Sequence, residues 1–391
     1  MKSRRGRILL CLIGVLVLIS LTAVGAKAAE PVVDEWRIPA FSIITGPLAS
    51  AGEQINWAID YNVRVINESG GMAGRPIVVE YHDTAYDPGR TVSEMSKVVG
   101  KAFLIWGPMA DNPMKAAMPL VIRHKSFNIT PCCGAQPAKD FQPWTVTLEA
   151  DYPDAVPEPM AKWIELNPDI KTVVQFVWPE SPTWMAIAQV QREALEAVGV
   201  KVLPDIECSE GVDFGSAVIR AMSQKADAYT INFFPNFAAR IVIELDKRGL
   251  TEKRRIMLFC TAEGPELYEM AGKRLDGCYH WSLVNPLSDY PRWQKLLESY
   301  HQDFPDLATP PVYFPAICDM VLLTKWAVEE LGITGDPKQR EEEASKLREF
   351  CRNADNVPGV MGEFNMVDGF PKRPGYFFQI RDGKKVSIPL D

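Results

Sequence analysis

Hydrophobic and polar positions follow two alternating patterns along this chain. The first unit has a short apolar run at residues 38–44, an amphipathic stretch at about 54–67 and a second apolar run at 77–81. Apolar runs of about four to eight residues between turn residues are typical of buried strands, and a period of about 3.6 residues is typical of helices. The unit therefore predicts a strand, a helix and a second strand parallel to the first.

The same alternation continues in two series. The apolar runs predict further strands at residues 102–106, 126–130, 172–177, 201–206, 228–233, 256–259 and 278–283. The amphipathic segments predict helices at residues 92–101, 114–124, 154–166, 186–198, 214–224 and 238–248. Strands that alternate with helices form parallel sheets covered on both faces. An irregular stretch at 135–148 separates the series, so we predict the α/β fold class with two doubly wound parallel-sheet lobes.

The last third of the chain has a different pattern. Long apolar-faced segments predict helices at 289–304 and 315–331, and a charged one predicts a helix at 339–353. Two short runs predict strands at 362–365 and 375–380. This part of the chain does not continue the regular alternation of strand and helix.

The first 28 residues have the pattern of a cleaved secretory signal. Four cations precede an apolar run at residues 8–24, and the small-residue exit Ala26-Lys27-Ala28 follows it. An uncleaved membrane anchor is the alternative, because the run is near the lower length limit for a span. The small-residue exit favours cleavage, so we expect a soluble, exported, periplasmic protein.

Charge excludes some partners of the exported chain. Five of the 42 Lys and Arg residues and none of the 50 Asp and Glu residues lie in the signal, which leaves 37 against 50 and a net charge of −13. An acidic surface of this size repels nucleic acid and anionic lipid. We therefore expect no nucleic-acid partner, and we expect a monomer.

The sequence indicates neither a metal site nor a catalytic centre. Seven cysteines remain after the signal, but their spacing and that of the four scattered histidines match no zinc motif. No P-loop, G-x-S-x-G or G-x-G-x-x-G motif is present. We expect no metal, no cofactor and no enzyme. Two points stay open: a reactive thiol in the pair Cys132-Cys133, and a disulfide between Cys318 and Cys351.

The turns that follow the predicted strands are where a ligand is expected. In open parallel sheets, ligands lie beyond the carboxyl ends of the strands, and helix N-termini there favour anions. Aromatic side chains gather at two of these ends, in the segments 178–184 and 233–234. Such a cluster favours a pocket wall over core packing.

The opening stretch resembles type I periplasmic solute-binding proteins, the receptors of branched-chain amino acid ABC importers. The motifs that carry the resemblance are Thr45-Gly46-Pro47, Asn67-Glu68-Ser69-Gly70-Gly71-Met72-Ala73-Gly74-Arg75 and the acidic turn at 83–88. Looser similarity covers nearly all of the exported chain. The resemblance implies two lobes joined by a three-strand hinge that close on a small molecule. It implies lobe 1 at 34–151 plus 285–369, lobe 2 at 152–284 plus 370–391, and a membrane permease as partner.

The resemblance also implies a set of ligand-binding positions. Members that bind amino acids hold the carboxylate and ammonium groups with hydroxyl side chains where this chain has Asp111 and Gly134. The acid that holds the ammonium has a counterpart in Glu263, and the aromatic that closes over the ligand has one in Phe234 or Trp184. The ligand-binding residues that we predict are Leu48, Met109, Ala110, Asp111, Cys132, Cys133, Gly134, Thr183, Trp184, Phe234 and Glu263.

Several interpretations of these positions stay open. Asp111 fits a helix cap as well as a ligand contact, and Glu263 fits a solvated loop acid. The missing hydroxyls argue against an α-amino acid held in the usual way, so we expect an amino-acid-like solute or an aromatic or short-chain carboxylate. A cationic ligand held by Asp111 and Glu263 is one alternative, and a ligand-sensing module that feeds a signalling protein is another.

Overall fold

The computed structural model of the protein describes residues 33–46, 48–131, 135–180, 182–209, 213–305, 307, 310–373 and 375–390. The predicted signal and the segment Cys132-Cys133-Gly134 lie outside these ranges. Within the described part of the chain, no helix is long and apolar enough to cross a membrane.

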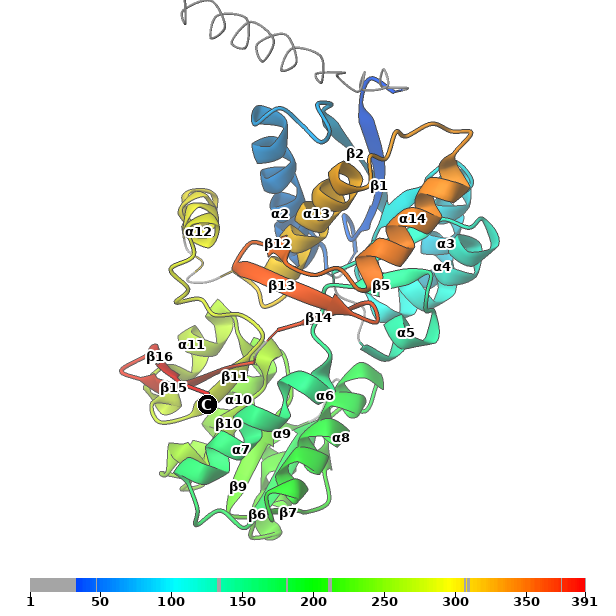
Figure 1. Cartoon of the computed structure of the whole chain (residues 1–391). Helices are drawn as coiled ribbons and strands as arrows, with labels where there is room; N and C mark the ends of the chain where they lie inside the picture. The colour runs from blue at the N-terminus through cyan, green and yellow to red at the C-terminus, as the bar shows by residue number, and fades with distance from the viewer. Residues whose placement is uncertain are drawn as a thin grey trace, which may run out of the picture.

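The first lobe is built on a five-stranded parallel sheet with the order β2-β1-β3-β4-β5. This lobe forms the upper half of the molecule in Figure 1. Its strands are β1 (Trp36–Ser42), β2 (Ile77–Asp83), β3 (Leu104–Trp106), β4 (Phe127–Thr130) and β5 (Thr145–Thr147). The helices that accompany it in the chain are α2 (Ala49–Glu68), α3 (Pro88–Val98), α4 (Asp111–Arg123) and α5 (Ala135–Asp140). From the last third of the chain come α12 (Pro291–Asp303), α13 (Phe314–Glu330) and α14 (Arg340–Arg352).

Alternating side chains divide this lobe into two cores. Trp36, Ile38 and Ala40 of β1 pack with α2, α12 and α13, whereas Phe41 packs on the opposite face with α3 and α4. Successive side chains of a strand point to opposite faces, so a strand buried on both faces reads as one continuous apolar run. This explains why the run at 38–44 carries no polar alternation.

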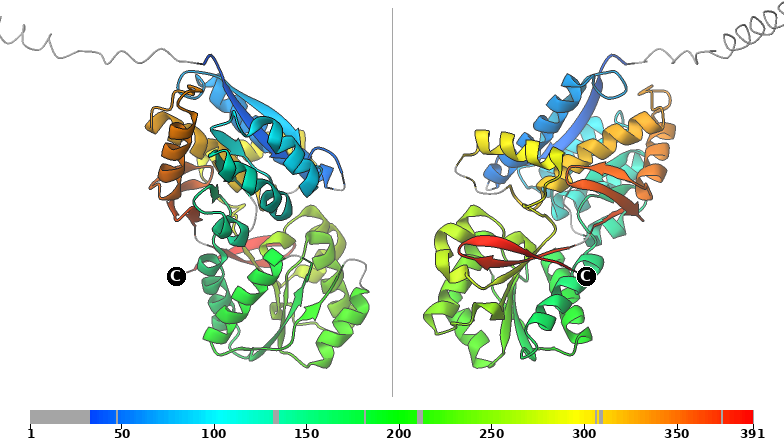
Figure 2. Two further views of the ribbon diagram at one scale, coloured as in Figure 1. Left: turned by 90° about the vertical axis from the view of Figure 1, so that its right-hand side faces the viewer. Right: turned by 60° about the vertical axis from the view of Figure 1, so that its left-hand side comes forward.

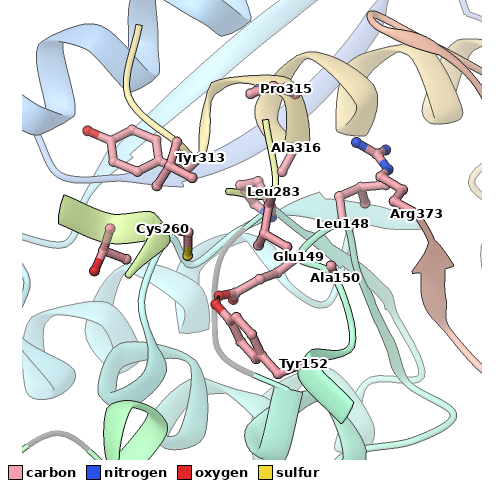
Figure 3. A pocket seen from close by; sticks show the side chains of 13 residues that line it. Leu148, Glu149, Ala150, Tyr152, Cys260, Leu283, Tyr313, Pro315, Ala316 and Arg373 are labelled. Atoms are coloured by element: carbon pink, nitrogen blue, oxygen red, sulfur yellow. Dashed lines mark hydrogen bonds between the residues drawn. The ribbon is translucent and has the colours of Figure 1, made fainter. Parts of the chain in front are cut away.

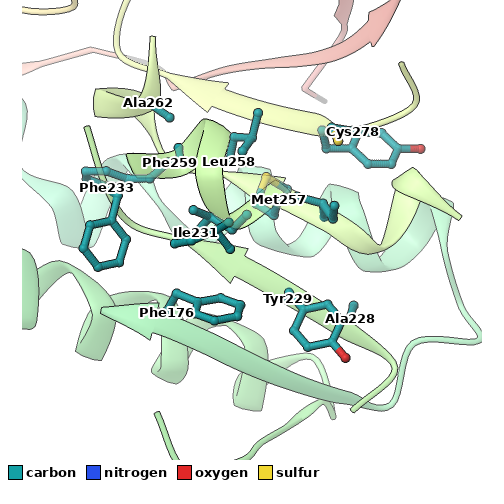
Figure 4. Packing of buried hydrophobic residues seen from close by; sticks show 14 of the residues in the cluster. Phe176, Ala228, Tyr229, Ile231, Phe233, Met257, Leu258, Phe259, Ala262 and Cys278 are labelled. Atoms are coloured by element: carbon teal, nitrogen blue, oxygen red, sulfur yellow. The ribbon is translucent and has the colours of Figure 1, made fainter. Parts of the chain in front are cut away.

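The second lobe is built on an eight-stranded sheet with the order β16-β15-β11-β10-β9-β6-β7, and β8 also pairs with β6. Its parallel strands are β6 (Thr172–Val177), β7 (Lys201–Val202), β8 (Ile206–Glu207), β9 (Ala228–Ile231), β10 (Ile256–Leu258) and β11 (Tyr279–Ser282). A hairpin of β15 (Tyr376–Arg381) and β16 (Lys384–Ile388) adds to β11 in antiparallel orientation. The helices are α6 (Tyr152–Ala155), α7 (Pro157–Leu166), α8 (Pro182–Ala197), α9 (Phe214–Ser223), α10 (Pro235–Lys247) and α11 (Pro265–Ala271). Figure 4 shows large apolar side chains of the central strands packed in its core.

The chain passes between the two sheets three times (Figure 2). It leaves the first lobe after β5, returns to that lobe after β11, and leaves it again after β14 (Phe370–Lys372) to enter β15. Before that last crossing, β14 closes a small antiparallel sheet with β12 (Val357–Gly359) and β13 (Gly362–Val367). The predicted lobe boundaries at 151/152, 284/285 and 369/370 stay a prediction, because a boundary also depends on which residues move together.

The glycine-rich motif of the opening stretch forms a tight connection between α2 and β2. The Asn67 side chain exchanges two hydrogen bonds with the backbone of Ile77, at 2.8 and 2.9 Å. Gly71 adopts φ +82°, and an added Cβ would lie 2.2 Å from the carbonyl oxygen of Arg75. The Arg75 guanidinium stacks over Trp36 at 3.8 Å. The motif therefore fixes the helix against the strand that follows it.

Asp83 and Thr45, which come from two motifs of the resemblance, meet at the ends of β1 and β2. The Asp83 carboxylate accepts hydrogen bonds from the backbone N–H groups of Ile44 and Thr45 at 2.9 and 3.1 Å and from the Thr45 hydroxyl at 2.6 Å. Burial alone would raise the pKa of Asp83, but the Thr45 hydroxyl and the N–H donors lower it to about 2.

Several predictions about the local structure were wrong. The stretch at 135–148 is not irregular, because it contains α5 and the edge strand β5, whose three residues are too few to show a period. The strand predicted at 201–206 is split into β7 and β8 around Pro204, which has no backbone N–H for a sheet. The helix predicted at 154–166 is divided into α6 and α7. Cys318 and Cys351 are both free, buried thiols, so the structure contains no disulfide between them.

Candidate functional site

A pocket of about 630 Å³, open to solvent, lies where the chain crosses between the lobes (Figure 3). Each of the three crossings contributes to its wall. The residues that line it are Pro131, Leu148, Glu149, Ala150, Tyr152, Cys260, Thr261, Leu283, Val312, Tyr313, Pro315, Ala316 and Arg373. Several of them directly follow β4, β5, β10 and β11, so the carboxyl ends of strands from both sheets face this pocket, as the sequence led us to expect.

Glu149 and Tyr152 form the acidic side of the pocket. Glu149 follows β5, and the Tyr152 hydroxyl at the start of α6 donates a hydrogen bond to its carboxylate. Figure 3 shows the two side chains reaching toward one another. Burial, and then the charge of Glu149, raise the pKa of Tyr152 well above its ordinary value, so the phenol stays protonated and remains a donor.

Arg373 brings a cation to the pocket from the third crossing. Its Nη2 lies 2.6 Å from the carboxylate of Asp319 on α13, and its guanidinium stacks over Phe364 at 3.9 Å. Asp319 is 1% exposed and also accepts a hydrogen bond from the Val360 N–H at 2.5 Å. Burial raises the pKa of Asp319, and the Arg373 charge opposes that shift. The pair ties the third crossing to the helix behind the pocket.

A second, smaller hollow adjoins the first, since Val312 lines both. Its other lining residues are Glu263, Ser282, Val284, Pro286, Trp293, Pro310 and Lys385. The Lys385 ammonium on β16 lies 2.5 Å from the Glu263 carboxylate, and both side chains are only 6% exposed. The Tyr268 hydroxyl also approaches Glu263, at 3.5 Å.

An aromatic cluster lies beyond the carboxyl ends of β6 and β9. Trp184 on α8 and Phe234 before α10 have ring centroids 4.6 Å apart, and Trp178 lies 5.3 Å from Trp184. Phe233 is buried beneath them, whereas Phe234 is 42% exposed. A large apolar ring held at the surface by other aromatic side chains offers a stacking partner for an apolar or aromatic molecule.

The predicted site residues fall into separate groups. Trp184 and Phe234 meet in the aromatic cluster, and Glu263 lies in the smaller hollow. Glu263 is 9% exposed and therefore is not a solvated loop acid. Leu48, at the N-cap of α2, is 38% exposed. Thr183 lies in α8, where the side chain falls outside the described part, and Cys132, Cys133 and Gly134 also lie outside it.

The third group stands at the start of α4. Met109 and Ala110 are buried, and Ala110 is the N-cap residue. Asp111 is the first residue of the helix and Ala110 precedes it as the N-cap, so the interpretation of Asp111 as the cap was wrong. The charge of Asp111 contributes to the raised pKa of Tyr152, which places it near the acidic side of the pocket.

None of the described residues that line the larger pocket is among the predicted ligand-binding residues. Glu149 and Tyr152 follow β5, a strand too short to recognise, and Arg373 and Lys385 come from the C-terminal segments. Only the pairing of β15 with β11 reveals that these segments return to the pocket. Across the described ranges, no group of three or more His, Cys, Asp or Glu side chains is placed to hold a metal ion.

Residues 35–385 match the family model described as periplasmic binding protein, so the chain belongs to this family of solute receptors, which are not enzymes. The predicted family and fold class are confirmed: two parallel sheets flanked by helices, in the arrangement of type I members.

Known relatives agree with this assignment. The Leu/Ile/Val-binding protein BraC3 of Rhizobium johnstonii is 26% identical over 186 residues, which are 47% of this chain and 50% of that protein, so the match spans about half the length of the curated relative. LivJ of Streptococcus pneumoniae, solved with isoleucine, has a TM-score of 0.73 at 19% identity, covering 90% of this chain and all of LivJ (100%). A solute-binding protein of Rhodopseudomonas palustris BisB5, solved with 3,4-dihydroxybenzoic acid, has a TM-score of 0.75 at 18% identity, covering 91% of this chain and 97% of that one.

Proposed function

We propose that this protein is the exported receptor of an ABC importer, and that it captures a small organic solute between its two lobes. This proposal rests on the observation that residues from all three crossings between the lobes line one pocket. Rotation of one lobe against the other about these crossings changes the shape of that pocket. A ligand that contacts both lobes therefore stabilises the closed arrangement and shifts the population toward it.

The side chains in and around the pocket favour a ligand that has a carboxylate group and an apolar or aromatic body. Leu148, Leu283 and Val312 supply apolar wall, and the ring of Phe234 offers a stacking surface at the edge of the second lobe. Arg373 supplies positive charge, and the N–H groups at the start of α4 favour an anion. Two structural relatives were solved with ligands of this general kind, isoleucine in one and 3,4-dihydroxybenzoic acid in the other.

A cationic ligand is the second candidate, and Glu149 is the observation that favours it. Glu149 lines the larger pocket, and the influence of Asp111 on Tyr152 brings a second acid near it. A carboxylate that lines a pocket attracts a cation. If the ligand is an anion, Arg373 is the dominant charge of the pocket; if it is a cation, Glu149 is.

The remaining parts of the proposal concern the setting of the receptor. We place it in the periplasm, as a monomer that delivers its solute to a membrane permease. The lobes would be residues 34–151 plus 285–369 and residues 152–284 plus 370–391. The family match over residues 35–385 supports the periplasmic receptor role.

Titration calorimetry with a small panel tests the ligand class. The panel is isoleucine, 4-methylpentanoate, 3,4-dihydroxybenzoate and 2-phenylethylamine, titrated into the chain without its first 28 residues. We expect micromolar binding of a carboxylate. Binding of the amine alone would establish the cationic alternative, and no binding up to millimolar concentration would contradict the proposed ligand class.

A pair of variants tests whether the aromatic cluster takes part. Phe234→Ala removes an exposed ring, so we expect a loss of affinity for 3,4-dihydroxybenzoate of about 2- to 12-fold, the usual value of one aromatic contact. Ile219→Ala is the control, because Ile219 is 56% exposed on α9 and lines neither pocket. Equal affinities for the two variants would exclude Phe234 from the ligand contact.

A further inference from the structure

Glu263 and Lys385 form a buried ion pair in the hollow that adjoins the main pocket. We propose that Lys385 is a built-in counter-ion for Glu263, which makes this receptor select organic acids that carry no ammonium group over the matching amino acids. The inference rests on the proposed function, since it concerns the ligand of the same interlobe site.

Glu263 needs a cation where it stands. Its side chain is 6% exposed, and a carboxylate removed from water is costly unless a charge and hydrogen bonds compensate it. If the chain did not supply that cation, an ammonium group on the ligand would be the natural partner. A short-range ion pair in a site that excludes water is far stronger than the same pair in bulk solvent.

Among the described residues, His280 is a second basic side chain beside Glu263, but it does not neutralise the carboxylate. His280 is fully buried, and its Nε2 lies 3.0 Å from the carbonyl oxygen of Phe259, where only an N–H can sit. The remaining nitrogen, Nδ1, then carries a lone pair toward Glu263 at 3.4 Å. Burial, and next the charge of Lys385, lower the pKa of His280 to about 3. His280 is therefore neutral at pH 7, so Lys385 is the cation that the described side chains place beside Glu263.

The hairpin β15–β16 holds Lys385 at this place. Lys385 stands opposite Ile380 in the hairpin, and its ammonium lies 2.5 Å from Glu263 and 5.0 Å from the centroid of the Phe378 ring. A tethered group acts at an effective concentration of about millimolar or more. A ligand at micromolar concentration cannot displace it. The ammonium of an amino acid would thus find the Glu263 carboxylate already paired with Lys385.

The ion pair is close enough to the main pocket to act on its ligand. Val312 lines both hollows, and Glu263 lies two residues after Thr261, which lines the larger one together with Cys260. The pKa of the Cys260 thiol, raised chiefly by burial, is also influenced by Glu149 and by Lys385. Both charged groups therefore lie within electrostatic reach of the same pocket residue.

Matched ligands that differ only in the α-ammonium group test this inference. The two pairs are 4-methylpentanoate with leucine and 3-phenylpropanoate with phenylalanine, measured by calorimetry on the wild-type protein. We expect the acid of at least one pair to bind about tenfold or more tightly than its amino acid, because an uncompensated buried ammonium costs at least that factor. If the amino acid binds as tightly as its acid, the receptor function stands and the inference is overturned. If no member of either pair binds, the inference is overturned, and the panel that contains 3,4-dihydroxybenzoate decides separately whether the proposed ligand class stands.

Substitution of Lys385 tests the same inference in the opposite direction, because it should restore binding of the amino acid. Lys385→Met leaves Glu263 without its cation, so the amino acid of the bound pair should gain about tenfold in affinity relative to wild type. Lys385→Gln keeps a hydrogen-bond donor for Glu263 and replaces the methionine variant in this test if that variant does not fold. For Lys385→Gln we expect a smaller gain in affinity for the amino acid. Lys384→Met is the control, because Lys384 is exposed on the same strand. An unchanged amino-acid affinity in both Lys385 variants would overturn the inference.

Discussion

Replacing Asp319 by asparagine removes the negative charge that holds Arg373 at the third crossing. Asp319 is 1% exposed and lies 2.6 Å from Arg373, whose side chain is 13% exposed. Breaking a buried ion pair by removing one partner costs about 3–5 kcal/mol, because the other charge is left without compensation. Arg373 keeps some contact with water, so we expect the lower end, a loss of about 3 kcal/mol in the free energy of unfolding. Asparagine can still accept the hydrogen bond of the Val360 N–H.

Urea unfolding followed by circular dichroism measures this loss as a lower midpoint with an unchanged slope. Arg373→Met should cost about 3–5 kcal/mol, since it leaves the more deeply buried carboxylate unpaired. The double variant should cost less than the sum of the single ones by about 2 kcal/mol, because it leaves neither charge behind. Glu165→Gln is the control: Glu165 pairs with Lys162 on an exposed face, so its loss should cost less than about 0.5 kcal/mol.

The opposite result would refute this account of the crossing. If Asp319→Asn unfolds at the same urea concentration as wild type, Arg373 does not depend on Asp319 for its charge balance. Additive costs in the double variant would show that the two side chains act independently.

Two further predictions concern the opening stretch. The folded pKa of Asp83 is about 2, below its ordinary 3.8, so its contribution to stability is complete above pH 4 and is lost as the pH falls toward 2. In acid titrations followed by circular dichroism, the Asp83→Asn variant should therefore lose less unfolding free energy over this pH range than the wild type does. An equal loss in the two proteins would contradict the role of Asp83. In urea unfolding, Gly71→Ala should lower the free energy of unfolding more than Gly70→Ala does. Both residues have positive φ, which costs an alanine about 1 kcal/mol, but of the two only at Gly71 would the new Cβ meet a backbone oxygen, at 2.2 Å. Equal losses in the two variants would disprove the clash.

The regular parts of the fold could be predicted because local patterns encode them. Strand β6 and the central helices follow from runs of apolar residues and from helical periodicity. Strand β5 could not be predicted, because three residues carry no period and its pairing depends on β4. The C-terminal hairpin was only half predicted for the same reason. Its place beside β11 is a matter of tertiary pairing between residues about a hundred positions apart.

The candidate site was predictable only where it directly follows a recognisable strand. Trp184 and Phe234 follow predicted strands, and the structure brings their rings together. Glu149 follows the unpredicted β5, and Arg373 and Lys385 reach the pockets from distant segments. Glu263 was recognised as a candidate acid, but nothing in its neighbourhood along the chain reveals that Lys385 stands beside it. Charge pairing across the fold is therefore the information that the sequence pattern lacks.

Small-angle X-ray scattering with and without ligand tests the central claim most directly, namely that the lobes close on a solute in the pocket formed by the three crossings. The measurement uses whichever of 4-methylpentanoate and 3,4-dihydroxybenzoate binds more tightly in calorimetry, at a saturating concentration. Our account predicts a smaller radius of gyration in the presence of the ligand, because the lobes approach one another around it. An unchanged scattering curve at full occupancy, or the absence of binding by either acid, would contradict it.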